Sequence, residues 1–350
     1  MGGTASWLDQ LATSMQSQGH QVRIISGLTE ANEAQAQMNP ILDIKFLSCL
    51  KKKISLVSDF KSLIQIRNEI RLFNPTVINT HTSKAGLLTR LANITLLGRR
   101  SKLVHTLHGH LLYGYFPKWK IWIIIGIERF MGMFANLILV PGKRVAIEAE
   151  SAGLLNKKKV FEVVPGVPIP RIQLKPKGSP KVRVGWLGRI TQIKRPDRVI
   201  ELAKMFPEVE FFIGGDGELM STLRANASSN VYFRGWVDAD VFWRGVDIAL
   251  LTSDNEAMPI SLIEAGMLSL PAVTTNVGST SEVVINGKSG YVVQTDIDSM
   301  AKALQALVES SELRREFGKY AREFTTSTFS PKNQLDSHMR AYKIALGIKL

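Results

Sequence analysis

The sequence predicts an α/β protein of two domains, each built on a parallel sheet with helices on both faces. The chain has 350 residues, more than one hydrophobic core usually serves, and 45% of them are apolar. Short β-branched runs alternate with helical patterns, which is typical of parallel sheets. A stretch rich in proline, glycine and lysine separates two such series, so we place a linker at residues 166–180.

The first series lies in residues 1–165, which we predict to form a Rossmann-like N-terminal domain. Its predicted strands are Val22–Ser26, Val77–Thr80, Leu103–Leu107 and Leu137–Val140. Gly2-Gly3 leads directly into an amphipathic helical pattern with no strand before it. Because a Rossmann unit begins with a strand that is usually central, we expect the first strand of this domain to be missing from the sequence.

The second series lies in residues 181–330, which we predict to form the C-terminal domain. Its predicted strands are Val182–Gly185, Val209–Ile213, Asp247–Leu251 and Ala272–Thr274. We expect the last segment, residues 331–350, to form a helix that packs back on the N-terminal domain.

The chain is strongly basic, with a formal net charge of +14 and a pI near 9.8. Residues 1–165 hold 21 Lys and Arg against 10 Asp and Glu, so most of the excess lies in the first half. Such a charge indicates an anionic partner, which can be a nucleic acid, a membrane surface or a phosphate-bearing substrate. A large anionic partner should therefore meet the N-terminal domain.

Cysteine content and hydropathy restrict the location of the protein. Cys49 is the single cysteine, which excludes an internal disulfide and a cysteine-based zinc cluster and fits a reducing cytoplasm. No stretch approaches the roughly 20 apolar residues that span a bilayer, and the N-terminus lacks a signal-peptide pattern. We therefore expect a cytoplasmic protein that is neither secreted nor membrane-spanning.

Two cations follow the first predicted strand of the C-terminal domain. Gly188-Arg189 forms the turn after this strand, and Lys194 comes just before a predicted helix. The carboxyl ends of parallel strands bind ligands in α/β sheets, and helix N-termini favour phosphate. The pattern is consistent with a diphosphate site or with a solvated basic loop.

Two further loops follow predicted strands. The loop around Gly215 lets a ligand approach the backbone closely, although a plain tight turn accounts for it equally well. Asp238-Ala239-Asp240 has the form of a metal pair, but it stands where a helix should begin. We predict that it caps this helix and does not bind a metal.

The segment Asn255–Ala265 is the most informative part of the sequence. A strand ends before it, Glu256 lies in the turn, and Pro259 marks the start of a helix that holds Glu264. The backbone amides of residues 258–260 suit a phosphate, while Glu256 suits sugar hydroxyls and Glu264 suits a ribose diol. The alternative is two ordinary surface glutamates.

These motifs, in this order, resemble glycosyltransferase family 4, a set of retaining enzymes with the GT-B fold, in which two Rossmann-like domains face each other across a cleft. The resemblance covers nearly the whole chain and includes Val277–Val284 after the paired glutamates. It departs at Ala257 and Ser279, where the family often has glycine, which leaves the transferred sugar open. It implies transfer of a sugar from a nucleotide diphosphate, with UDP favoured, and retention at the anomeric carbon.

The resemblance also implies which residues act. His108, Glu256, Arg189 and Lys194 form the catalytic set, in which His108 and Glu256 orient the sugar and the cations stabilise the leaving diphosphate. No metal and no cofactor are implied, because protein cations and helix dipoles take over that charge. The residues expected to contact the donor are Gly3, Gly188, Arg189, Lys194, Gly215, Val237, Glu256, Met258, Pro259, Ile260 and Glu264.

Two segments of the N-terminal domain match those of polysaccharide-building members. They are Thr80–Gly86 and His105–His110, and the second contains His108. His81 at a strand end, with Ser83 and Lys84 at a helix start, suits an acceptor phosphate. The implied product is a bacterial surface polysaccharide.

The stretch Leu111–Ile123 mixes aromatic residues with lysines. It suits a membrane interface, where Trp lies at headgroup depth and Lys meets anionic lipid, or a domain core with a lysine rim. Lys51–Lys53 and Lys157–Lys159 favour the membrane. We therefore expect peripheral contact with the inner face of the plasma membrane and a lipid-linked or glycan acceptor.

Other functions are compatible with parts of the pattern. A nucleotide-sugar epimerase can share the fold and the donor site, although the paired glutamates with Arg189 and Lys194 favour transfer. A nucleic-acid-binding protein would explain the basic first half, but the sequence contains no recognised nucleic-acid module. A chain without its first strand could also be inactive.

Overall fold

The structure is a computed structural model. It describes residues 3–28, 38–51, 53–96, 101–108, 122, 125–126, 129–130, 132–151, 153, 159–170 and 181–349. The chain divides into two compact units. Unit 1 comprises Met1–His110, Pro117–Gly166 and Pro331–Leu350, and unit 2 comprises Leu111–Phe116 and Val167–Ser330. Within the described ranges, no helix is both long enough and apolar enough to cross a bilayer.

Unit 2 is built on a six-stranded parallel sheet in the order β12-β11-β10-β7-β8-β9. Three strands, β10, β11 and β12, follow β7 on one side, and two strands, β8 and β9, follow it on the other, which is the doubly wound order. The order reverses between β7 and β10, and ligands of such sheets bind in the crevice at the carboxyl ends of these two strands. The strands are β7 (Arg183–Leu187), β8 (Glu210–Gly214), β9 (Val231–Gly235), β10 (Ile248–Leu251), β11 (Ala272–Thr275) and β12 (Gly290–Val293).

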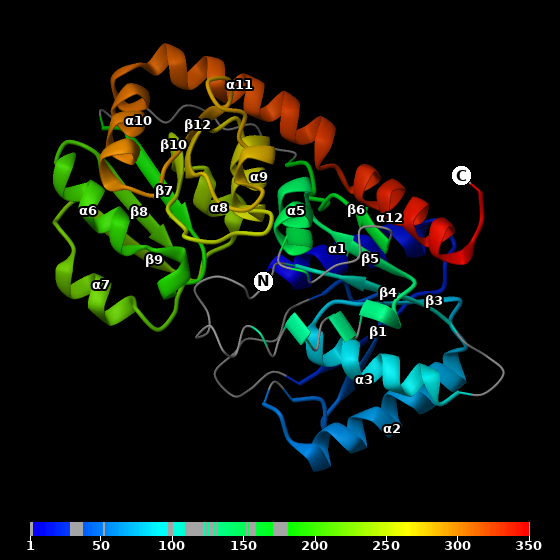
Figure 1. Cartoon of the computed structure of the whole chain (residues 1–350). Helices are drawn as coiled ribbons and strands as arrows, with labels where there is room; N and C mark the ends of the chain where they lie inside the picture. Colours follow the sequence, from blue (N-terminus) through cyan, green and yellow to red (C-terminus); the bar gives the residue numbers. More distant parts are fainter. Residues whose placement is uncertain are drawn as a thin grey trace. The chain divides into compact units, whose positions relative to one another are not determined.

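Helices cover both faces of this sheet (Figure 1). Every residue of β10 and β11 is buried, as expected for central parallel strands that are apolar on both sides. The chain runs from each strand's carboxyl end into a helix or turn, so the helix N-termini gather at the ligand-binding edge. The helices are α6 (Asp197–Met205), α7 (Met220–Asn226), α8 (Ala239–Trp243), α9 (Ile260–Met267), α10 (Ile297–Glu309) and α11 (Ser311–Thr328), with short 3-10 turns η2 (Gln192–Lys194) and η3 (Thr280–Glu282).

Unit 1 contains a four-stranded parallel sheet in the order β3-β4-β5-β6 and a separate parallel pair, β1-β2. Within the described ranges, no strand joins the two sheets. The strands are β1 (Arg23–Gly27), β2 (Asp43–Leu47), β3 (Val77–Thr80), β4 (Lys102–Thr106), β5 (Leu137–Val140) and β6 (Val160–Glu162). The helices are α1 (Gly3–Ser17), α2 (Leu56–Phe73), α3 (Ser83–Ile94), α5 (Lys143–Ser151) and α12 (Pro331–Leu346).

Two apolar clusters hold unit 1 together. Trp7 of α1 packs with Ala341 and Tyr342 of α12 against the buried strands β4 and β5. The C-terminal helix therefore lies beside α1 within unit 1 (Figure 1). The second cluster joins Ile66 and Ile70 of α2 to α3 and to the β1-β2 pair.

All eight predicted strands form, and their ends differ from the prediction by at most two residues. Four strands were not predicted, namely β2, β6, β9 and β12. Each has exposed or half-buried residues, and β6 contains only three residues, so neither run length nor apolar content distinguishes them from loops. The unit boundary falls after Gly166, whereas residues 171–180 of the predicted linker lie outside the described residues.

Candidate functional site

The point where the strand order of unit 2 reverses brings Lys194 and Glu256 into contact. Lys194 Nζ donates to Glu256 Oε1 at 2.6 Å, and Ser253 Oγ donates to the same oxygen at 2.6 Å. The Glu256 side chain is 6% exposed and that of Lys194 is 25% exposed, so the carboxylate is fixed while the ammonium reaches the surface. Arg189, in the turn after β7, is exposed at the same edge.

Thr252 connects the elements that position this pair. Its Oγ1 accepts a hydrogen bond from Trp186 Nε1 of β7 at 3.0 Å and donates to the carbonyl of Arg195 at 2.8 Å. The turn that holds Lys194 is thus tied to the ends of both β7 and β10. Arg195 adopts a left-handed backbone, with φ of 49°, and its guanidinium pairs with Asp197. This network keeps Lys194 next to Glu256.

Two glycines allow close backbone approach at this edge. Gly215 has φ of 119°, and a Cβ there would clash with the carbonyl of Gly188. Gly278 has φ of 49°, and a Cβ there would clash with the carbonyl of Glu256. The loops after β7, β8, β10 and β11 are therefore packed backbone against backbone, which leaves their amides near the ligand-binding edge.

Helix α9 begins where the sequence predicts. Pro259 is the N-cap residue, with φ of −77° and ψ of 95°, and the first helical residue is Ile260. The prediction that Pro259 marks the start of this helix is therefore confirmed. The amides at the start of a helix have no acceptor within it, so those near Met258 and Ile260 remain suitable for an anion.

Glu264 is a half-buried residue of α9 with a perturbed carboxyl group. Burial, followed by the negative charge of Asp238, raises its pKa from 4.5 to about 7, and the nearby Trp243 side chain opposes this shift. Such a carboxyl group exchanges its proton near neutral pH. Perturbed groups of this kind are common in binding sites.

The Asp238–Asp240 segment caps a helix, as predicted. Asp238 accepts a hydrogen bond from the amide of Val241 at 3.2 Å, and Asp240 pairs with Arg244 at 2.7 Å. Val237 is half-buried between β9 and this cap. In the part of the chain that the structure describes, no three His, Cys, Asp or Glu side chains are grouped so that they could hold a metal ion.

Unit 1 brings His81 and His108 together. His81 follows β3 directly and His108 follows β4, and their Nδ1 and Nε2 atoms are 2.7 Å apart. The two rings are stacked, with centroids 5.0 Å apart, and the Trp7 ring meets the edge of His108 at 5.1 Å. Burial lowers the pKa of His108 to about 4 and holds that of His81 well below 6.5. Both imidazoles are therefore neutral at pH 7.

Two residues of this cluster were not identified from the sequence. Trp7 also meets His338 of α12, with ring centroids 5.8 Å apart, and His338 Nδ1 lies 2.8 Å from the carbonyl of Gln334. The sequences of α1 and α12 do not by themselves indicate that Trp7 and His338 lie next to His108. Packing between the two ends of the chain has no local sequence signature.

Lys84 has a different environment from the one predicted. Its ammonium pairs with Asp59 at 2.6 Å and donates to the carbonyls of Lys51 at 2.7 Å and Lys53 at 2.6 Å. These three acceptors match the three N–H groups of the ammonium. The geometry thus gives no support to Lys84 as a ligand of an acceptor phosphate; instead, the side chain anchors the segment before α2. Ser83 is exposed at the first position of α3, and Gly3 is the first residue of α1.

The predicted interfacial stretch Leu111–Ile123 lies outside the described residues except for Trp122, which is 72% exposed. Lys52, Lys157 and Lys158 also lie outside them. Lys159 donates to the carbonyls of Met133 at 3.0 Å and Ala135 at 2.8 Å, so its ammonium serves the fold of unit 1.

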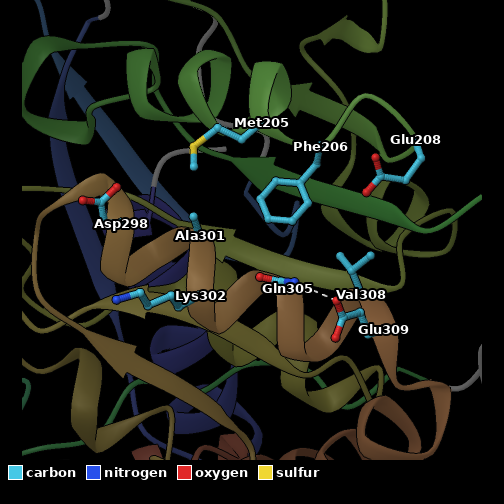
Figure 2. Close-up of a pocket in the computed structure, with 9 residues that line it drawn as sticks. All are labelled: Met205, Phe206, Glu208, Asp298, Ala301, Lys302, Gln305, Val308 and Glu309. Carbon is cyan, nitrogen blue, oxygen red and sulfur yellow. Dashed lines mark hydrogen bonds between the residues drawn. The ribbon is translucent and has the colours of Figure 1, made fainter.

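A cavity of about 450 Å³ lies elsewhere in unit 2, between the end of α6 and one face of α10 (Figure 2). Met205 and Phe206 line it on one side, and Lys302, Gln305 and Glu309 line it on the other. The α6 end precedes β8, so this cavity lies toward the amino ends of the strands and contains none of the candidate donor residues.

Two family models match the chain. Residues 1–171 match "Glycosyltransferase Family 4", and residues 171–324 match "Glycosyl transferases group 1". One curated relative is the Escherichia coli UDP-Gal:alpha-D-GlcNAc-diphosphoundecaprenol alpha-1,3-galactosyltransferase, 26% identical over 77% of this chain and 75% of the relative. Another is the Staphylococcus aureus capsular polysaccharide biosynthesis glycosyltransferase CapM, 23% identical over 80% of each chain.

Solved structures show the same fold. A sucrose-phosphate synthase from Thermosynechococcus elongatus has a TM-score of 0.84 at 16% identity and covers 99% of this chain and 94% of its own. Anabaena HepE in complex with UDP and glucose has a TM-score of 0.80 at 15% identity, over 98% and 96% of the two chains. The chain therefore has the GT-B fold.

The relatives named above are glycosyltransferases, so they do not favour an epimerase or a nucleic-acid-binding protein. The two family models together span residues 1–324, which include the motifs that carry the resemblance described above. The chain therefore belongs to the family 4, or group 1, glycosyltransferases.

Proposed function

We propose that this glycosyltransferase moves a sugar from a UDP-sugar to a lipid-linked or glycan acceptor in bacterial surface polysaccharide synthesis, with retention and without a metal ion. The observation that supports it best is the Lys194–Glu256 contact at the point where the strand order of unit 2 reverses. A cation, a fixed carboxylate and a helix N-terminus meet there, and these are the groups that a nucleotide-sugar requires.

The leaving diphosphate is stabilised by Arg189, Lys194 and the amides of residues 258–260. Thr252 holds the turn that carries Lys194, and the glycine loops hold the backbone next to Gly188 and Glu256, so these parts of the site need little reorganisation as negative charge develops. Glu264 accepts hydrogen bonds from the ribose, while Gly188, Gly215 and Val237 contact the nucleotide through backbone atoms. In this proposal, unit 2 is the donor-binding domain.

The anomeric configuration is retained because the acceptor hydroxyl attacks the anomeric carbon on the same face from which the diphosphate leaves. The bond between the anomeric carbon and the diphosphate oxygen breaks, and the acceptor oxygen bonds to the same face of that carbon. The acceptor hydroxyl proton passes to the departing phosphate oxygen, so no side chain needs to act as general base. Glu256 and His108 orient the sugar, and Gly3 contacts the donor phosphates.

Unit 1 binds the acceptor, with His81 and Ser83 at the carboxyl end of β3. A lipid diphosphate-linked sugar fits the name of the Escherichia coli relative and the basic character of residues 1–165. The enzyme then works in the cytoplasm, at the inner face of the plasma membrane.

Product stereochemistry tests this proposal. The protein is incubated with UDP-galactose, UDP-glucose and UDP-N-acetylglucosamine and a synthetic GlcNAc-diphosphate-lipid, with magnesium or with EDTA. We expect one donor to give a product whose anomeric configuration, measured by proton NMR, matches that of the donor, with the same yield in EDTA. An inverted product or a strict metal requirement would contradict the proposal.

A further inference from the structure

Helix α2 exposes an apolar face that nothing in unit 1 covers among the described residues. Leu56, Val57, Phe60 and Ile64 lie on one side of the helix at positions i, i+1, i+4 and i+8, and Ile54 precedes them. Their exposed fractions are 86%, 68%, 65% and 42%, with 87% for Ile54. We call these five residues the α2 face.

The opposite side of α2 is an ordinary core side. Ser62, Ile66 and Ile70 are buried, and both isoleucines belong to the cluster with α3 and the β1-β2 pair. The helix is therefore held in unit 1 by its inner side, while the apolar residues of its outer side remain exposed among the described residues. Apolar patches of this kind on a soluble surface usually mark an interaction site.

Charge shows which partner fits the α2 face. The acidic residues of α2 are Asp59 and Glu69, and both are engaged within unit 1, Asp59 with Lys84 and Glu69 with Arg23 and Lys45. The basic residues next to the α2 face along the chain are Lys51, Lys53, Lys61, Arg67 and Arg71, and all of them except the half-buried Arg67 are exposed. An apolar stripe next to basic residues suits the surface of an anionic bilayer, where the lipid headgroups are negatively charged and the acyl chains below them are apolar.

The position of the α2 face relates it to the acceptor residues of the same unit. Lys84, at the start of α3, holds the carbonyls of Lys51 and Lys53 and the carboxylate of Asp59. This clamp fixes the first turn of α2 beside the first turn of α3 (Figure 1). The α2 face therefore begins at the edge of unit 1 where His81 and Ser83 lie.

We infer that the α2 face is a docking surface for anionic lipid, which holds unit 1 against the bilayer with its acceptor residues at the lipid surface. The inference deepens the proposed function. It rests on that function in one respect, namely that a lipid-linked acceptor would explain why the enzyme binds a membrane.

Vesicle flotation with the full chain tests the inference. The vesicles contain phosphatidylcholine alone or with phosphatidylglycerol, at low and high salt. The variants are Leu56→Ser and Phe60→Ser on the α2 face and Lys61→Glu at its border. The matched control is Leu72→Ser, which changes a residue of the same helix that is 74% exposed and outside the α2 face.

We expect the wild type to float with anionic vesicles at low salt and less at high salt. Phe60→Ser should lower the partition coefficient about tenfold or more, the loss expected from one buried aromatic side chain, and Leu72→Ser should change it less than about twofold. Lys61→Glu should weaken binding to anionic vesicles and not to neutral ones. Thermal melts establish that each variant is folded.

Three results would overturn the inference. The first is a wild type that does not bind anionic vesicles at low salt. The second is an equal loss of vesicle binding in Leu72→Ser and Phe60→Ser. The third is a wild-type dimer that Phe60→Ser converts to a monomer while vesicle binding is unchanged. The last would assign the α2 face to a second copy of the chain. UDP binding, measured by calorimetry in the same variants, should be unaffected, which distinguishes failure of this inference from failure of the proposed donor site.

Discussion

His81 Nδ1 and His108 Nε2 share one hydrogen bond of 2.7 Å, so the two imidazoles select each other's tautomer. One nitrogen of the pair donates and the other accepts, and burial keeps both rings neutral. The orientation of His108 is therefore fixed by a neighbour that comes from a different strand. In the proposed function, His81 then has a positioning role toward His108 in addition to its proposed contact with the acceptor.

Substitution of His81 tests this relationship. His81→Leu removes the hydrogen bond, whereas His81→Asn keeps a polar atom close to the position of Nδ1. We expect kcat to fall up to about tenfold in His81→Leu, since a hydrogen bond contributes about 0.5–1.5 kcal/mol, with most activity retained in His81→Asn. The UDP dissociation constant should not change in either variant. Equal losses of kcat in both variants would refute the positioning role.

The buried histidines predict an acid-labile unit 1. Burial lowers the pKa of His105 to about 3 and those of His108 and His338 to about 4, all below the usual 6.5. The unfolded chain therefore binds more protons than the folded one between about pH 4 and 6.5, so stability falls as the pH is lowered through this window. Denaturant unfolding between pH 7.5 and 4.5 measures the slope. His338→Asn should reduce the slope, and an unchanged slope would argue against a buried neutral His338.

The raised pKa of Glu264 predicts a change of stability with pH that is opposite to that of the buried histidines. The folded state keeps a proton on this carboxyl up to about pH 7, whereas the unfolded state loses it near 4.5. The free energy of unfolding should therefore decrease as the pH rises from 4.5 to 7 through this group. Glu264→Gln should remove that decrease relative to the wild type. It should also weaken UDP binding more at pH 8 than at pH 6, because a carboxylate accepts hydrogen bonds from both ribose hydroxyls.

Lys84 should affect stability more than acceptor binding. Lys84→Met removes the ion pair with Asp59 and leaves the carbonyls of Lys51 and Lys53 without this donor. We expect a loss of ~1–2 kcal/mol in the free energy of unfolding. Lys332→Met is the control, since the Lys332–Asp336 pair is exposed and contributes little. A raised acceptor KM in Lys84→Met at unchanged stability would restore the phosphate-ligand interpretation.

The fold could be predicted largely from the sequence because parallel strands in an α/β protein are apolar on both faces. Leu137–Val140 and Ile248–Leu251 are buried at every position and are recognisable as continuous apolar runs. Strands with exposed positions lack such a continuous apolar run. In β9, for example, Tyr232 and Arg234 are exposed. The strand order was likewise not readable from local patterns, since pairing is decided by tertiary packing.

The site was predictable where its residues are adjacent to strand ends. Glu256 and Lys194 are 62 positions apart, yet each follows a central strand, and that rule was sufficient to bring them together. The sequence did not reveal that Ser253 shares the Glu256 oxygen, that Lys84 is occupied by carbonyls before α2, or that Trp7 and His338 enclose His108. These contacts depend on loop geometry and on packing between distant segments, which have no periodicity.

The most direct test of the account is calorimetric titration of UDP, without magnesium, into the wild type and into Arg189→Ala, Lys194→Met and Glu264→Ala. The account predicts that UDP binds the wild type with the same affinity in EDTA and that each substitution weakens binding, with GDP and ADP binding less well. A folded wild type that binds no nucleoside diphosphate, or binding that is unchanged in all three variants, would contradict the assignment of the donor site to the carboxyl edge of unit 2.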